Sequence, residues 1–492
     1  MGCCRAFAYV VVVLAAFLTA VTHRYAAKSP KEWDEFLHYH RPFPLNTING
    51  VHKFIQEFIY APGLVHFDPD ALEAAAISRA GLDDFGSPTY RAGLEQLTAA
   101  ANGDSRLTLM GALVMREAIT NYLHRRLQIV NHAKEHPELQ ELKVEKPIFI
   151  VGLPRTGTTL LQSMLSSEIN ELRAPLQWEL YAPFPVPQAD DELNKAQIAE
   201  AEFVTNGALS LIPNMARMHP EFTFDASEDI HIQAFEFNTR LFAAFMRAPD
   251  YLRWIFNSSV DLAYVMAWHE TFVRHLMSDE GRHQGRRWLF KAPRYLMMVE
   301  EIFAKYPDAY IVHTHRHPEK SVPSMATLET LTGGVTSDDV ETELVTRLCI
   351  ELYEYAANKT MQWRLEHADE IAAGKYKILD IHLDEMKADT GAVVDRIIEF
   401  ADLNVSPEER EAITEFQKNF GIKKHKPYKP KPELFFNVDE NGHFMPDESP
   451  IMQYYRNFSP VKDANESYLG GSTVSYATPY ASAASSASKP EL

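Results

Sequence analysis

Residues 147–165 read PIFIVGLPRTGTTLLQSML, and this stretch indicates the class of fold. The run 148–151 is short and apolar, as in a buried strand, and apolar residues recur at helical spacing from Thr158 onward. Gly152 and Gly157 lie between the two patterns, so we predict a glycine-rich loop that connects a strand to a helix. Glycines allow backbone N–H groups to point inward, and the helix N-terminus adds partial positive charge. The stretch therefore predicts an anion-binding loop.

The loop has the glycine spacing of a nucleotide-binding P-loop but lacks its lysine. Gly152 and Gly157 are separated as in G-x-x-x-x-G-K-[ST], and Thr158 stands where that motif has Lys. Because this Lys contacts the β- and γ-phosphates, its replacement disfavours hydrolysis of ATP or GTP. A positive charge lies inside the loop instead, at Arg155.

The segment PRTGTTLL after a strand closely resembles the 5′-phosphosulfate loop of sulfotransferases. These enzymes use 3′-phosphoadenosine 5′-phosphosulfate (PAPS), and the Arg form of the loop is similar to that of tyrosylprotein and carbohydrate sulfotransferases. The resemblance implies that Arg155 stabilises the leaving phosphate during catalysis and that no metal is needed. The cofactor-binding residues that it implies in this loop are Pro154, Arg155, Thr156, Gly157, Thr158 and Thr159.

Two further segments resemble the same family. Residues 309–328 read AYIVHTHRHPEKSVPSMATL, with a predicted strand before Arg316 and a helix after it. In the family, an Arg at a strand end and a Ser eight residues later bind the 3′-phosphate, so the resemblance implies this role for Arg316 and Ser324. The segment LFKAP resembles the family's strand-end Lys motif and implies a catalytic Lys291, although Tyr295 stands where such relatives have His.

The general base is expected to be a carboxylate. In Arg-loop relatives it is a Glu some twenty-odd residues after the loop cation, which implies Glu179 in the segment LRAPLQWELYAPFP. The aromatic and proline neighbours of Glu179 predict an apolar setting, which raises a carboxyl pKa. A second acidic segment, MHPEFTFDASEDI, contains His219, Asp225, Glu228 and Asp229. We expect this run to cap a helix, and the alternatives are a wall of the acceptor pocket or the source of the base.

Apolar runs alternate with helical stretches through the middle of the chain. The runs 287–291, 309–315 and 376–381 are strand-like, and each precedes a helical pattern. Such alternation predicts an α/β fold with a P-loop-like parallel sheet flanked by helices. Residues 191–280 look mostly helical and are expected to cap the substrate side. The N-terminal part is expected to form helices over 70–80, 89–101 and 105–135.

These patterns divide the chain into four parts. We expect a helical N-terminal region over 29–145, a sulfotransferase domain over 146–436 and a C-terminal extension over 437–492. The extension is rich in Ser and Ala from about residue 463, and we expect that stretch to be disordered. Residues 1–28 are expected to be a signal anchor or a cleaved signal peptide.

The N-terminal segment indicates the compartment. The run 7–21 is apolar and carries no charge, and five N-x-[ST] sequons follow in the body of the chain. We therefore expect a glycoprotein of the secretory pathway, either a single-pass Golgi membrane protein with a lumenal catalytic domain or a secreted protein. The sequons are at Asn257, Asn358, Asn404, Asn457 and Asn465.

Composition excludes several other classes of protein. The chain has 492 residues with 67 acidic and 48 basic side chains, so its formal net charge of -19 opposes a nucleic-acid partner. Only three cysteines are present, which excludes a disulfide scaffold and a cysteine-rich zinc site. The expected function is transfer of the sulfuryl group of PAPS to a hydroxyl or amine of a glycan, peptide or small-molecule acceptor. The alternatives are a P-loop-like kinase or NTPase and a non-catalytic nucleotide-binding protein with the same fold.

Overall fold

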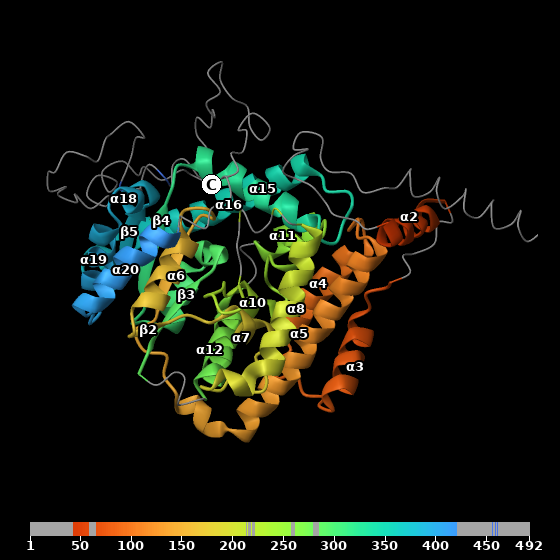
Figure 1. The fold of residues 1–492 in the computed structure, drawn as a ribbon, viewed down its shortest axis with the longest axis horizontal. Coiled ribbons are helices and arrows are strands. Elements are labelled where there is room, and N and C mark those ends of the chain that lie inside the picture. Colours follow the sequence, from red (N-terminus) through yellow and green to blue (C-terminus); the bar gives the residue numbers. More distant parts are fainter. Residues whose placement is uncertain are drawn as a thin grey trace, which may run out of the picture.

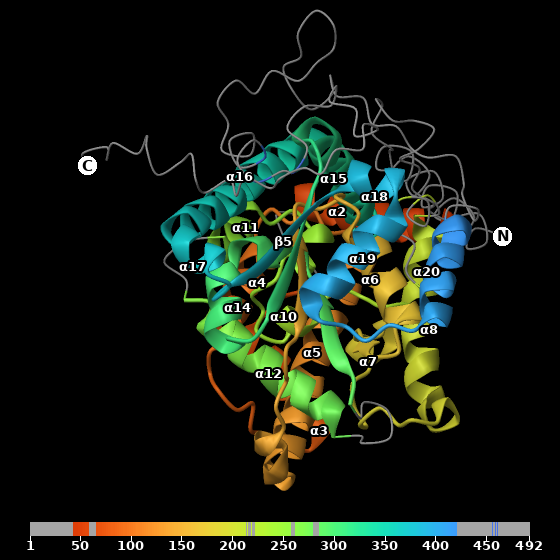
Figure 2. The same ribbon diagram turned by 90° about the vertical axis from the view of Figure 1, so that its left-hand side faces the viewer.

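The computed structural model describes residues 43–58, 65–212, 214, 218, 222–256, 261–278, 285–420, 455, 458 and 460. Its centre is a five-stranded sheet in the order β2-β3-β1-β4-β5, with every neighbouring pair parallel (Figures 1 and 2). The predicted α/β class with a parallel sheet flanked by helices is therefore confirmed. The strands are β1 (Ile148–Gly152), β2 (Leu172–Arg173), β3 (Arg287–Lys291), β4 (Tyr310–His315) and β5 (Lys377–His382).

Alternation along the central strand gives the sheet two buried faces. Ile148 and Ile150 of β1 contact one hydrophobic cluster, while Phe149 and Val151 contact the other. This is expected because successive side chains of a strand point to opposite faces. The first face is covered by α6 (Thr158–Glu168), α18 (Leu383–Ala388), α19 (Thr390–Ala401) and α20 (Pro407–Phe420). The second face is covered by α12 (Ala263–Met277), α14 (Val299–Lys305), α16 (Thr342–Glu366) and the 3-10 helix η5 (Pro293–Met297).

The predicted N-terminal helices are present and pack onto the second face. Their residues share one hydrophobic cluster with α12 and α16, so they extend the central core. Asp68 begins α3 by accepting hydrogen bonds from the backbone of residues 70 and 71, and Thr108 caps α5 in the same way. The predicted helices are α3 (Pro69–Ala80), α4 (Tyr90–Asn102) and α5 (Leu109–Glu135). The N-terminal region also contains α2 (Phe43–Phe58) and the 3-10 helix η2 (Pro137–Glu141).

A mostly helical segment connects β2 to β3, as the sequence predicts for residues 191–280. It contains α7 (Gln177–Tyr181), η3 (Asp191–Asn194), α8 (Lys195–Leu211), α10 (Ile230–Ala234), η4 (Phe242–Ala244) and α11 (Pro249–Ile255), followed by α12. Two more helices, α15 (Pro318–Gly333) and α17 (Ala368–Ala372), precede β5. Among the described helices, none has the length and apolar character needed to cross a membrane. The expected signal segment 1–28 and the Ser/Ala-rich tail lie outside the described residues.

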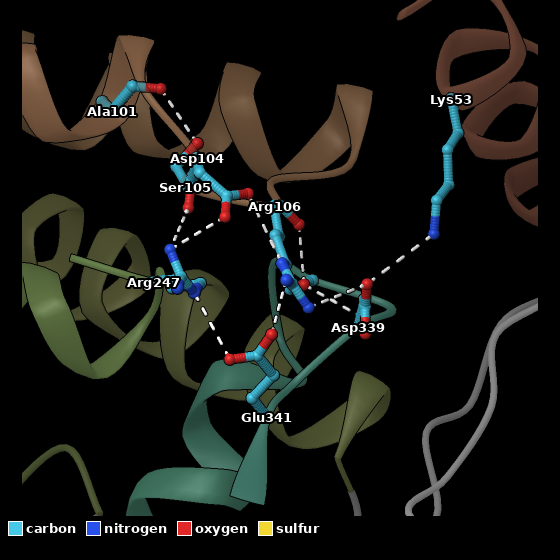
Figure 3. A network of polar contacts seen from close by, with 9 residues as sticks. Lys53, Ala101, Asp104, Ser105, Arg106, Arg247, Asp339 and Glu341 are labelled. Atoms are coloured by element: carbon cyan, nitrogen blue, oxygen red, sulfur yellow. Dashed lines mark hydrogen bonds and ion pairs between the residues drawn. The ribbon is translucent and has the colours of Figure 1, made fainter. Parts of the chain in front are cut away.

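An ion-pair network joins distant parts of the chain on one side of the molecule. Arg106, in the loop between α4 and α5, contacts Asp339 at 3.2 Å and Glu341 at 2.5 Å, both in the loop between α15 and α16. Arg247 contacts Asp104 at 2.9 Å and approaches Glu341 at 3.6 Å (Figure 3). The network therefore connects the N-terminal helices to the loop that follows α15.

Candidate active site

The glycine-rich loop lies at the carboxyl edge of the sheet, between β1 and α6. Gly152 pairs with Thr314 of β4, and a Cβ at Gly152 would lie 2.5 Å from the Thr314 carbonyl oxygen. Thr156 Oγ1 contacts Thr314 Oγ1 at 2.6 Å and donates to the Leu153 carbonyl at 2.7 Å. Glycine at the first position therefore allows the loop to pack against β4, and buried Thr156 supports the loop from beneath.

The N-terminus of α6 begins directly after the loop. Gly157 caps the helix at φ +94°, a left-handed conformation that favours glycine, and no side chain caps the first turn. Thr158 and Thr159 follow as the first residues of α6 and line a cavity of about 400 Å³. The first backbone N–H groups of a helix have no partner within the helix. This end of the cavity therefore has the donors that an anion requires.

Three of the residues expected to bind the cofactor converge beside this helix. Arg155 Nε donates to Ser324 Oγ on α15 at 3.1 Å, and Arg316 Nη1 donates to the Arg155 carbonyl at 2.9 Å. Arg155 has φ +69°, an uncommon conformation for a residue with a side chain, and these contacts hold it. Pro154, Arg155, Gly157 and Arg316 all line the cavity. The structure thus brings the two separate sequence motifs together.

The two guanidinium groups form a buried positive region. Burial, and then repulsion from Arg316, lower the pKa of Arg155 to about 10, with attraction to Glu228 acting in the opposite direction. Burial also lowers the pKa of Arg316. The buried Nε of Arg316 has no hydrogen-bond partner in the described part of the chain. An anion between these groups would relieve both the repulsion and the missing hydrogen bond.

Lys291 ends β3 and binds a carboxylate that reaches the cavity. Its side chain is buried, and its Nζ lies 2.6 Å from Glu228 Oε1. Glu228 lines the cavity, and its side chain is 12% exposed. Lys291 is not among the described lining residues, so in this structure it acts on the cavity through Glu228.

Asp229, the neighbour of Glu228, is fully buried and attaches this segment to β3. Its Oδ2 accepts from the Lys291 backbone N–H at 3.0 Å and from Tyr295 Oη at 2.9 Å. Burial raises the pKa of Asp229 well above its usual range. The acidic run was expected to cap a helix, but Asp229 makes no side-chain cap on α10 and binds β3 and Tyr295 instead. His219 of the same run lies outside the described residues.

Glu179, the carboxylate expected to act as base, has the contacts of a structural residue. It is completely buried on α7, and both of its oxygens accept from Arg173 Nη2, at 2.7 and 2.8 Å. It also accepts from the Leu176 backbone N–H at 2.9 Å, closing the first turn of α7. Glu179 is not among the described residues that line the cavity, whereas Tyr181, two residues later, is. Its assignment as the base stays a prediction, and the geometry favours Glu228.

One cluster away from the cavity has side chains of the metal-binding type. The ligand atoms of His313, His315 and Asp380 lie within 4.8 Å of one another. Arg364 occupies the carboxylate, however, with contacts of 2.8 and 2.7 Å to the two Asp380 oxygens, and its Nη1 also contacts His313 Nδ1 at 2.9 Å. The cluster is therefore a buried ion pair that links α16 to β4 and β5.

Several cavity residues had no signal in the sequence. His231 lines the cavity with its Nδ1 at 2.9 Å from Tyr122 Oη, and burial lowers its pKa to about 4. Arg240 forms an ion pair with Glu329 of α15, and both line the cavity. Their separation along the chain follows no local motif, so only the fold brings them together.

Comparison with known proteins identifies the family. Residues 147–407, more than half of the chain, match the sequence profile described as the sulfotransferase family. The chain belongs to the sulfotransferase family. The matched region contains the loop, Glu179, Glu228, Lys291, Arg316 and Ser324.

Solved structures agree with this assignment at the level of the fold. Sulfotransferase STF9 from Mycobacterium avium is 22% identical with a TM-score of 0.65, covering 80% of this chain and 95% of that one. Sulfotransferase STF1 from Mycobacterium tuberculosis H37Rv is 24% identical with a TM-score of 0.61, covering 70% and 92%. No curated protein sequence matched the chain.

Proposed function

We propose that this sulfotransferase transfers the sulfuryl group of PAPS to a hydroxyl or amine of an acceptor bound in the same cavity. The observation that carries the proposal is the convergence of Arg155, Arg316 and the α6 N-terminus at one end of a cavity that Glu228 also lines. Cations and helix N–H groups suit the phosphates of the donor, and a carboxylate suits the removal of a proton from the acceptor.

The residues present fit PAPS. The Nε of Arg316, which has no hydrogen-bond partner among the described residues, and the lowered pKa values of the two arginines are features that a bound anion would relieve. PAPS supplies an activated sulfuryl group whose transfer leaves a phosphate behind. In the proposal, Arg316 and Ser324 hold the 3′-phosphate, while Thr158, Thr159 and Arg155 hold the 5′-side and neutralise its growing charge.

We propose Glu228 as the general base in preference to Glu179. Glu228 lines the cavity and is held by Lys291 at 2.6 Å, so its orientation is fixed while part of it stays accessible. Proton removal by a positioned carboxylate contributes typically about 10²–10⁴-fold to rate. Lys291 acts in this scheme as a positioning residue, because it holds Glu228 toward the acceptor.

Calorimetric titration with 3′-phosphoadenosine 5′-phosphate and with ADP tests the donor site. We expect the 3′-phosphorylated nucleotide to bind much more tightly, because Arg316 recognises the 3′-phosphate. Arg316→Ala should cost about 1.5–3 kcal/mol of that binding, the usual worth of a hydrogen bond to a charged group. Arg253→Ala is a control, since Arg253 pairs with Glu351 and does not line the cavity. Equal affinity for the two nucleotides would contradict the proposal.

We also propose a lumenal catalytic domain in the Golgi, anchored through residues 1–28. The support is the uncharged apolar run 7–21 and the sequons, of which Asn404 is exposed in the structure. Expressed in a secretory system, the protein should lose mass on endoglycosidase treatment, and Asn404→Gln should reduce that loss. A full-length protein that is unglycosylated and protease-accessible from the cytosol would contradict this placement.

A further inference from the structure

The lining of the cavity combines two groups of residues with different chemistry. The donor end is formed by the loop, the start of α6 and Arg316. Another part of the lining comes from the start of α10, the segment around η4 and one side of α15, three segments far apart along the chain. Its apolar lining residues are Ile230, Leu241, Ala244, Phe245, Met325 and Leu328. The name "acceptor wall" is used below for these six residues.

The charged groups beside the acceptor wall are already paired within the protein. Arg240 and Glu329 form an ion pair, with side chains only 13% and 12% exposed. Glu228 is bound by Lys291. Burial lowers the pKa of His231 to about 4, so its ring is neutral at physiological pH and contacts Tyr122 Oη. Apart from the arginines of the donor site, the described lining cations are Arg240 and Lys387, and Lys387 is paired with Asp384 at 2.8 Å. Neither cation is therefore dedicated to an anionic acceptor.

We infer that the acceptor is a compact apolar molecule with a hydroxyl group, such as a phenol, a steroid alcohol or another lipophilic alcohol. This inference rests on the proposed function. A sugar carries several hydroxyls around one ring, and burying a hydroxyl without a hydrogen-bond partner is unfavourable. Ligand sites for apolar molecules combine hydrophobic walls with a few placed polar groups. The acceptor wall with Glu228 and His231 has that composition.

Size and charge agree with a compact acceptor. The cavity of about 400 Å³ includes the donor end, so only part of it is available to the second substrate. The formal net charge of -19 repels sulfated or carboxylated polymers over a distance. An acceptor of moderate volume and no charge faces neither restriction.

Acceptor profiling with PAPS tests the inference with three probes: 2-naphthol, N-acetylglucosamine and a tyrosine-containing acidic peptide. We expect kcat/KM for 2-naphthol to exceed that for the other two at least 100-fold. In parallel, titration of 2-naphthol into the complex with 3′-phosphoadenosine 5′-phosphate should show saturable binding. Preference for the sugar or the peptide, or absence of 2-naphthol binding, would overturn the inference.

A pair of matched variants locates the effect on the acceptor wall. Phe245→Gln places an amide in the wall and should raise KM for 2-naphthol about tenfold, the scale of a small change in a hydrophobic pocket. Phe203→Gln is the control, because Phe203 on α8 is 81% exposed and does not line the cavity. Both variants should keep the affinity for 3′-phosphoadenosine 5′-phosphate.

The outcomes separate this inference from the proposed function. PAPS-dependent transfer to the peptide or sugar, unaffected by Phe245→Gln, rejects the apolar acceptor and keeps the sulfotransferase activity. Saturable binding of 2-naphthol without transfer to any probe, together with equal binding of ADP and the 3′-phosphorylated nucleotide, rejects the proposed donor site instead.

Discussion

Two carboxylates near the sheet edge have opposite surroundings. Glu179 gives both oxygens to Arg173 and one to a backbone N–H, so its hydrogen-bonding capacity serves α7. Glu228 has Lys291 on one side and the cavity on the other. A general base must be within reach of the acceptor proton, and this geometric requirement comes before any consideration of pKa.

We predict that the two Glu→Gln variants differ in their effect on the kcat of the folded enzyme. Glu228→Gln should lower this kcat by about 10²–10⁴-fold with normal nucleotide affinity, although it also lowers the thermal midpoint because buried Lys291 loses its counter-charge. Glu179→Gln leaves Arg173 buried without a full counter-charge and should cost about 3 kcal/mol of folding stability, with kcat of the folded enzyme nearly retained. Steady-state kinetics on an accepted substrate, with thermal unfolding of each variant, measure both effects.

The reverse result would restore the sequence-based assignment. If Glu179→Gln abolished kcat while its thermal midpoint and nucleotide affinity stayed normal, Glu179 would be the base. The cavity, which Tyr181 of α7 already lines, would then have to extend to Glu179 in the substrate complex. Near-normal kcat in both variants would move proton removal to another residue, with His231 the nearest described candidate on the cavity lining.

At the scale of elements, the turn from β1 into α6 depends on Gly157. A Cβ there would lie 2.6 Å from Met386 Cε and 2.7 Å from Leu383 Cδ1, both on α18, and φ is +94°. We predict that Gly157→Ala loses about 1–2 kcal/mol of stability and weakens binding of 3′-phosphoadenosine 5′-phosphate. Gly207→Ala is a control of opposite sign. Gly207 is exposed within α8 with open space around it, so alanine should add about 0.5–1 kcal/mol. Chemical denaturation measures the stability of each variant, and calorimetric titration measures its nucleotide affinity. If Gly157→Ala changed neither quantity, this explanation of the turn would be wrong.

Local patterns predicted most elements, and the exceptions have physical causes. Four strands are apolar runs next to helical patterns and were therefore predicted from the sequence, namely β1, β3, β4 and β5. β2 spans only residues 172–173 and pairs with β3. A strand of this length is too short to show an alternating pattern, so the sequence did not predict it. Arg155, Arg316 and Ser324 were found because each belongs to a family motif, whereas the ion pair of Glu179 depends on a partner that no motif indicates. The apolar neighbours of Glu179 correctly predicted that its side chain is buried, but they did not predict its ion pair with Arg173.

At the scale of the whole molecule, the network around Arg106 connects segments more than 200 residues apart (Figure 3). Its partners are partly exposed: 50% for Asp339 and 36% for Glu341, so solvent screens each pair. We predict that Arg106→Ala costs about 0.5–1 kcal/mol of unfolding free energy, and that added salt reduces this difference. A double-mutant cycle with Glu341→Ala, measured at low and high salt, tests it. A coupling energy of zero at low salt would show that the network does not contribute to the stability of the fold.

The whole fold should also lose stability in mild acid, because it buries neutral histidines. Burial, reinforced by Lys305, lowers the pKa of His269 to about 3, with its Nδ1 at 2.9 Å from Tyr306 Oη. Between about pH 6.5 and 3 the unfolded chain therefore binds a proton here that the folded chain does not. By linkage, the unfolding free energy then falls as the pH falls, by up to about 1.4 kcal/mol per pH unit for each such histidine. His275, whose pKa burial also lowers to about 3, adds to the same slope.

We predict that His269→Gln flattens this pH dependence by up to one proton, although the variant is less stable at neutral pH. His66→Gln is the control, since His66 is exposed, and should keep the wild-type slope. Denaturant unfolding at several pH values between 7 and 4 gives the slope directly. An unchanged slope in His269→Gln would show that its ring binds protons equally in the folded and unfolded chains. The acid sensitivity would then have to arise from the other buried histidines, such as His275. Its Nδ1 faces His132 Nδ1 at 3.1 Å, so these two Nδ1 atoms cannot both carry a proton.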